Sequence, residues 1–175
     1  MMYRILLLQL IFLCYGLSAQ NAKKGFKLLE KAEYEKSYEA FADVLREDSQ
    51  NPAACLGRAL ILADEKSPLF NLIGAWEYAR TLKPVIEKLS PDELEYIGEY
   101  FLNTETRSIS RPVKKKIEYA VEIIEAKLIK YVREENNLDI VYSVLEKFPD
   151  FRHTANVIHI RNQLEFRKYE KNNTL

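Results

Sequence analysis

The chain has 175 residues, with 26 basic and 26 acidic side chains and a formal net charge of zero. A balance this even disfavours nucleic-acid binding, because nucleic-acid-binding proteins carry a concentrated basic excess. The chain has only five glycines and six prolines, which disfavours an all-β fold built on many tight turns.

Residues 1–19 have the layout of a secretory signal. Arg4 provides the positive start, an apolar run of about eleven residues follows, and small residues precede the expected cleavage site. The alternative of a membrane anchor is disfavoured, because this run is too short to cross a hydrocarbon layer of about 30 Å as a helix. A lipoprotein signal would use Cys14, but a bulky residue precedes it. We expect cleavage after Ala19, export to the periplasm or outer surface, and no integral membrane span in the processed chain.

The processed chain, residues 20–175, is expected to form a single helical domain. Cleavage removes Arg4, which leaves 25 basic and 26 acidic residues. Cys55 is then the only cysteine, so an intrachain disulfide is excluded. Its apolar neighbours predict a small buried side chain rather than a reactive thiol.

Apolar spacing and helix-boundary residues predict an all-α fold of about eight helices. The expected ranges are 22–31, 35–47, 52–63, 67–83, 91–101, 112–134, 138–148 and 154–171. Ser67-Pro68 is interpreted as the start of the fourth helix, and Ser90 with Glu93 as a capping box at the start of the fifth.

The helix expected at 112–134 has the most regular apolar pattern. Steps of four, three, four and four residues place five apolar side chains on one face. They are Ile117, Val121, Ile124, Leu128 and Val132. Glu118, Glu122 and Glu125 fall on other faces, which we expect to be solvated.

Gly25, Ser37, Phe41 and Val44 follow one another at spacings of twelve, four and three residues. This pattern, over residues 22–64, resembles a tetratricopeptide repeat followed by the first helix of the next. In that family a small residue at the position of Gly25 lets the second helix approach the first closely.

The resemblance weakens along the chain. Ser49 stands where the family has proline, and Arg58 replaces an apolar residue beside the small position at Ala59. Residues 65–135 form a degenerate helical region without a recognisable motif. Residues 136–175 contain a weaker pattern, similar to the repeats of Gram-negative envelope proteins.

The resemblance implies antiparallel helix pairs stacked as a short α-solenoid, whose first helices line a concave surface that binds peptide segments. Carried over by register, this groove would be lined by Phe26, Leu29, Glu30, Leu56, Leu60 and Asp64. Most of these residue types also suit a hydrophobic core.

A group of cations lies near the start of the helix expected at 112–134, where the helix dipole favours anions instead. The group consists of Arg107, Arg111, Lys114, Lys115 and Lys116. One interpretation is a site for an anion or an acidic partner, assisted by the free amides of the helix start. The alternative is charge pairing with a neighbouring helix, or a solvated face.

No pattern in the sequence indicates catalysis, a metal or a cofactor. His153 and His159 are six residues apart, whereas a helical zinc pair needs three or four. Phosphate-binding glycine loops and nucleophile elbows are not found.

We therefore expect an exported, non-enzymatic helical adaptor or scaffold that mediates protein–protein interaction in the bacterial envelope. The alternative is a module that binds a glycan or small ligand. A tight pocket with aromatic walls would favour the alternative, and a long open groove would favour a peptide partner.

Overall fold

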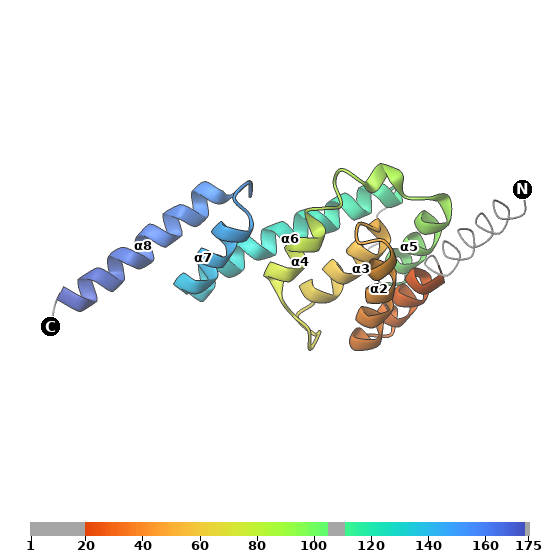
Figure 1. The fold of residues 1–175 in the computed structure, drawn as a ribbon, viewed down its shortest axis with the longest axis horizontal. Coiled ribbons are helices and arrows are strands. Elements are labelled where there is room, and N and C mark those ends of the chain that lie inside the picture. Colours follow the sequence, from red (N-terminus) through yellow and green to blue (C-terminus); the bar gives the residue numbers. More distant parts are fainter. Residues whose placement is uncertain (1–19, 105–110, 174–175) are drawn as a thin grey trace, which may run out of the picture. The chain divides into compact units, whose positions relative to one another are not determined.

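The computed structural model describes residues 20–104 and 111–173, and its regular secondary structure in these ranges is entirely helical (Figure 1). Residues 20–30 are helical, and seven further α-helices and one 3-10 helix follow. Their bounds are α2 Tyr34–Glu47, α3 Pro52–Ala63, α4 Leu72–Ala79, η1 Ile86–Lys88, α5 Pro91–Thr104, α6 Val113–Glu135, α7 Leu138–Lys147 and α8 Thr154–Asn173. The prediction of an all-α fold with about eight helices is confirmed. The predicted leader, 1–19, lies outside the described residues, so its cleavage stays a prediction.

Capping side chains account for most of the helix starts. At the start of α5 the predicted capping box forms: the Ser90 amide donates to Glu93 Oε2 at 2.8 Å, and the Glu93 amide donates to Ser90 Oγ at 3.2 Å. The predicted start of α4 is wrong. This helix begins at Leu72, because Asn71 caps it by accepting from the Gly74 amide at 3.0 Å. Ser67 is buried in the preceding turn instead.

The chain divides into two compact units, and the boundary lies within α6, between Ile124 and Glu125. In the first unit α2 packs against α3 and α3 against α4. In the second unit α7 and α8 pack together as a helical hairpin (Figure 1). The expectation of one domain over 20–175 stays a prediction.

Phe41 holds α2 close to the helical segment before it and to α3 after it. Its ring is buried and lies close to both Gly25 and Gly57. A Cβ atom added to Gly25 would lie 2.6 Å from the ring, and one added to Gly57 only 2.1 Å away. Ser37 donates to the Gly25 carbonyl at 2.8 Å. The close approach that the resemblance implies at Gly25 is therefore present.

The apolar stripe predicted along α6 is confirmed. Its five side chains, Ile117, Val121, Ile124, Leu128 and Val132, are all buried. Cys55 is buried as predicted, and burial raises the pKa of its thiol. The driving force for the fold is thus the removal of these apolar helix faces from water.

Candidate functional site

Helix α5 packs against one part of the groove predicted from the repeat resemblance, at Phe26 and Glu30. The Phe26 ring packs against the rings of Tyr96 and Tyr100, with centroids 5.6 and 5.4 Å apart. Asn103 of α5 also donates to Glu30 at 3.3 Å. Because α5 lies on this surface, an incoming peptide would have to displace part of the chain's own core.

The six predicted groove residues consequently divide into two sets. Phe26, Leu29 and Leu56 are buried and belong to the hydrophobic core, which corrects their expected role as an exposed lining. Glu30, Leu60 and Asp64 are half-buried. For these three, partner binding stays a prediction.

The Asp64 carboxylate accepts a hydrogen bond from a tyrosine hydroxyl. Tyr34 donates a 2.6 Å hydrogen bond to Asp64 Oδ2, and this bond raises the pKa of Tyr34 to about 12. Burial raises the pKa of Tyr100 to about 12, and the carboxylates of Asp64 and Glu30 add to the effect. Within this group, the Asp64 carboxylate therefore already accepts a hydrogen bond from the chain itself.

Two lysines of the predicted cation group pair with carboxylates, and binding of an anion or acidic partner by the group stays a prediction. Lys114 pairs with Glu87 at 2.5 Å and Lys115 with Glu118 at 2.6 Å, in line with the charge-pairing alternative. Because these pairs are exposed to solvent, they neutralise charge more than they hold the fold.

The remaining cations have other surroundings. Lys116 is buried, contrary to its expected exposure, with its Nζ atom 5.9 Å from the centre of the Phe101 ring. Arg111 lies over the Tyr119 ring at 5.2 Å. Arg107 lies outside the described residues. A pocket of about 300 Å³ beside Arg111 and Lys115 is lined equally by carboxylates, namely Glu118 and Glu122.

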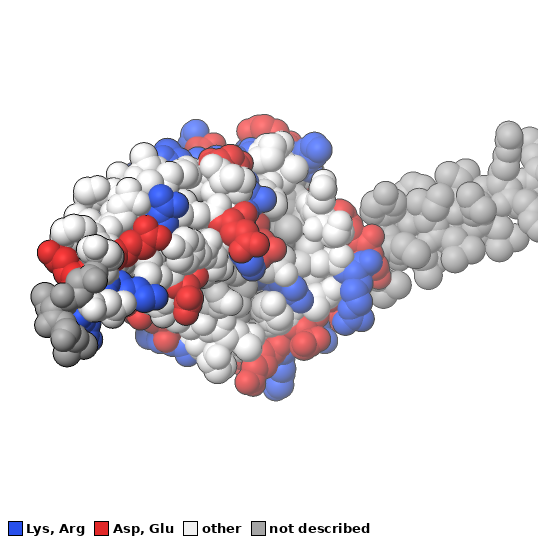
Figure 2. Space-filling model, turned by 60° about the vertical axis from the view of Figure 1, so that its left-hand side comes forward, with Lys and Arg blue, Asp and Glu red and all other residues white. Residues whose placement is uncertain are grey.

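Basic and acidic side chains are interspersed over the face of the molecule that Figure 2 shows. A surface of this kind gives little long-range attraction for a highly charged partner.

Glu125 is a buried carboxylate that the sequence interpretation placed on a solvated face. Its side chain is only 2% exposed, and Arg152 donates to it at 2.6 Å. The spacing in the sequence is consistent with the burial of Glu125, because this residue lies four residues after Val121 and three before Leu128, at the edge of the apolar stripe. The pair ties α6 to the residues before α8 within the second unit.

Helix α8 has two apolar faces on opposite sides. Val157 and Ile160 are buried on the side facing α7. On the other side, Ile158, Phe166 and Tyr169 are 36%, 60% and 67% exposed. We call this second side the outer face of α8; on the helix it also carries Ala155 and Asn162. A helix with apolar residues on both sides is built to pack against two neighbours.

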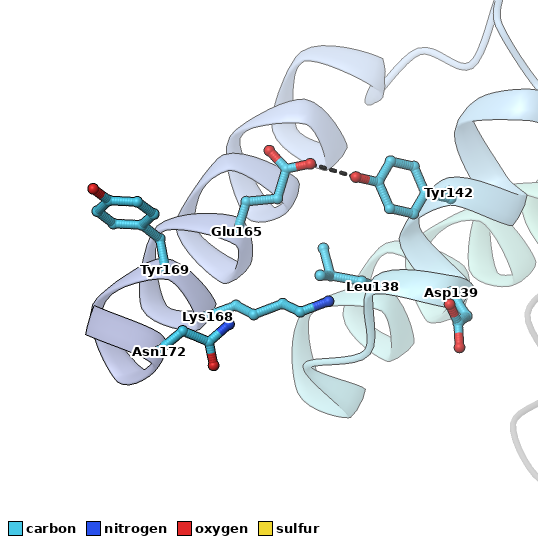
Figure 3. Close-up of a pocket in the computed structure, with 7 residues that line it drawn as sticks. All are labelled: Leu138, Asp139, Tyr142, Glu165, Lys168, Tyr169 and Asn172. Atoms are coloured by element: carbon cyan, nitrogen blue, oxygen red, sulfur yellow. Dashed lines mark hydrogen bonds between the residues drawn. The ribbon is translucent and has the colours of Figure 1, made fainter. Parts of the chain in front are cut away.

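The end of α8 diverges from α7. Every residue from 165 to 172 is exposed, and a pocket of about 370 Å³ opens between the two helices. Figure 3 shows Tyr142 of α7 pointing across to Glu165 of α8, to which its hydroxyl donates. This bond raises the pKa of Tyr142. Lys168 extends from α8 toward Leu138 along the same opening (Figure 3).

In 20–104 and 111–173, no three His, Cys, Asp or Glu side chains are grouped closely enough to hold a metal ion. No helix in those ranges is both long and apolar enough to cross a membrane.

Comparison with known proteins gives no family assignment. No family model, no curated protein and no solved structure matches this chain.

Proposed function

We propose that this protein is an exported, non-enzymatic helical adaptor that binds a protein partner in the bacterial envelope through the outer face of α8. Export rests on the leader-like pattern of residues 1–19, and the envelope location rests on that pattern together with the repeat resemblance.

The observation that carries the proposal is the exposure of Phe166 and Tyr169 on one side of a regular helix. Contiguous exposed apolar side chains usually mark interaction sites. Aromatic residues are also enriched among the side chains that dominate binding energy, because they remove a large apolar area from water. A helix face presents them in a fixed array, which limits the entropy lost on binding.

Capture of partners from envelope extract tests the proposal. The Phe166→Glu variant places a charge in the middle of the outer face and should lose the captured partner. Leu102→Glu is the matched control, because Leu102 is 68% exposed in α5 and Phe166 is 60% exposed in α8. Both variants should keep the helical circular dichroism of the unaltered protein. Equal capture by the two variants would refute the role of the outer face.

A second candidate, glycan or small-ligand binding, is favoured by the pocket between α7 and α8. Tyr142 contributes an aromatic ring there, and Asp139, Lys168 and Asn172 supply polar groups around it. Titration with soluble wall fragments tests this candidate. Binding that is lost in Tyr142→Ala but kept in Phe166→Glu would favour the glycan over a protein partner.

A further inference from the structure

We infer that the partner on the outer face of α8 is a second copy of this chain, packed α8 against α8 in antiparallel orientation. This inference rests on the proposed use of the outer face and adds the identity of its occupant. It comes from the sizes and charges of the side chains along that face and its edge, which complement those of an antiparallel copy.

The large and small side chains of the outer face are complementary under a two-fold axis at Asn162. Ile158 lies four residues before Asn162 and Phe166 four residues after it, while Ala155 and Tyr169 lie seven residues to either side. In a two-fold antiparallel pair the same patch meets itself. Ile158 then faces Phe166 of the second copy, and the small Ala155 faces the large Tyr169. A small residue opposite a large one lets two helices interdigitate at close range.

Asn162 suits the centre of such a symmetric interface. A side-chain amide carries both a donor and an acceptor, so two copies of Asn162 can hydrogen-bond to each other across the axis. A single polar residue within an apolar helix seam is a known means of fixing register and the number of chains. In the single chain, Asn162 Oδ1 accepts from Arg161 Nη2 at 3.0 Å.

The charges beside the outer face are also self-complementary. Arg161 and Glu165 lie one helical turn apart on the edge nearest α7. When two such edges run antiparallel, Arg161 of each copy lies near Glu165 of the other, which gives two reciprocal ion pairs. In a parallel pair this edge would instead face the opposite edge of the second helix, so the two reciprocal ion pairs form only in the antiparallel one.

Sedimentation equilibrium of the chain, purified as the cell processes it, tests the inference. We expect a monomer–dimer equilibrium. Phe166→Glu should weaken the dimer at least about 100-fold, because a roughly tenfold loss occurs at each of two symmetric positions. Leu102→Glu is the control and should leave the equilibrium unchanged. A chain that stays monomeric up to about 1 mM would overturn the inference.

A charge-reversal experiment identifies the antiparallel edge. Arg161→Glu alone and Glu165→Arg alone should each weaken self-association about tenfold, because two like-charge contacts replace two ion pairs. Mixing the two variants should restore association, since their edges are then of opposite charge. A mixture that associates no better than either variant alone would exclude this arrangement.

The same samples separate failure of this inference from failure of the proposed function. If the chain is monomeric but Phe166→Glu still loses a different captured protein, the outer face is an interface and the second copy is the wrong occupant. If the chain is monomeric and capture is unaffected, both proposals are wrong.

Discussion

Replacing Gly57 with alanine probes the close approach of α2 to α3 at Phe41. The new Cβ atom would lie 2.1 Å from Phe41 Cζ, whereas carbon atoms in contact are normally about 3.5–4.0 Å apart. The ring would therefore have to move by about 1.4 Å or more. Its room to move is limited, because Gly25 also lies close to the ring.

Two opposing contributions set the magnitude. Alanine stabilises a helix by about 0.5–1 kcal/mol relative to glycine. Overpacking of a well-packed core costs about 1–3 kcal/mol. We expect Gly57→Ala to lower the free energy of unfolding by roughly 1–2 kcal/mol, which corresponds to a fall of about 2–4 °C in Tm per kcal/mol for a chain of this size.

Urea unfolding followed by far-ultraviolet circular dichroism measures this change. Gly98→Ala is the control, because its Cβ meets only the end of the Val113 side chain, at 3.1 Å. That variant should be neutral or more stable. In a Phe41→Leu background the cost of Gly57→Ala should largely disappear, and a double-mutant cycle isolates the coupling. A Gly57→Ala protein that is as stable as the unaltered one would refute the tight packing proposed between Phe41 and Gly57.

Three further predictions concern other parts of the chain. Arg152→Ala should lower the free energy of unfolding by about 1–3 kcal/mol, because it leaves the buried Glu125 carboxylate without its donor; a thermal melt that matches the unaltered protein would contradict this. The pKa of Tyr34 is raised to about 12 by Asp64, so its contribution to stability is complete below about pH 10 and is lost as the pH rises through 12. Urea unfolding between these pH values should therefore show a smaller alkaline loss of stability in Tyr34→Phe than in the unaltered protein. Expressed from its full reading frame, the processed chain should begin directly after Ala19 by N-terminal sequencing, and an uncut product would refute the leader assignment.

Local sequence signals predicted most of the helices, because spacing and caps act within a few residues. The α6 stripe from Ile117 to Val132 is an example, since its periodicity alone defines one buried face. The start of α4 had two competing signals, Ser67-Pro68 and Asn71. A tertiary contact supports the Asn71 signal. The backbone amide of Asn71 donates to the Leu62 carbonyl at 2.8 Å, which fixes the chain just before the helix.

The burial of Phe26 and the contact made by Glu30 have a long-range cause. Phe26 and Glu30 were assigned to an exposed lining by repeat register, but α5 covers them, and Asn103 and Glu30 are 73 residues apart. A pattern confined to 22–64 contains no information about that distant helix. Arg58, the departure from the repeat pattern, has a similar explanation. Its guanidinium lies 4.0 Å from the centre of the Tyr38 ring and donates to the Tyr78 hydroxyl at 2.6 Å, so aromatic neighbours replace the expected apolar contact.

The outer face of α8 was visible in the sequence only as spacing. Ile158, Phe166 and Tyr169 share a helix side, but so do Val157 and Ile160, and periodicity cannot decide which side faces α7. The structure decides it by burying the second pair. The exposed side then becomes the candidate site.

Photocrosslinking in the expressing cell tests directly whether the outer face of α8 binds a partner. A photoreactive phenylalanine analogue placed at position 166 samples the outer face of α8 under native conditions. We predict a discrete adduct from this position, at twice the mass of the chain for a second copy, and none from the same analogue at the equally exposed Leu102. Absence of any adduct at position 166, or the same adducts from both positions, would contradict an interaction role for this face.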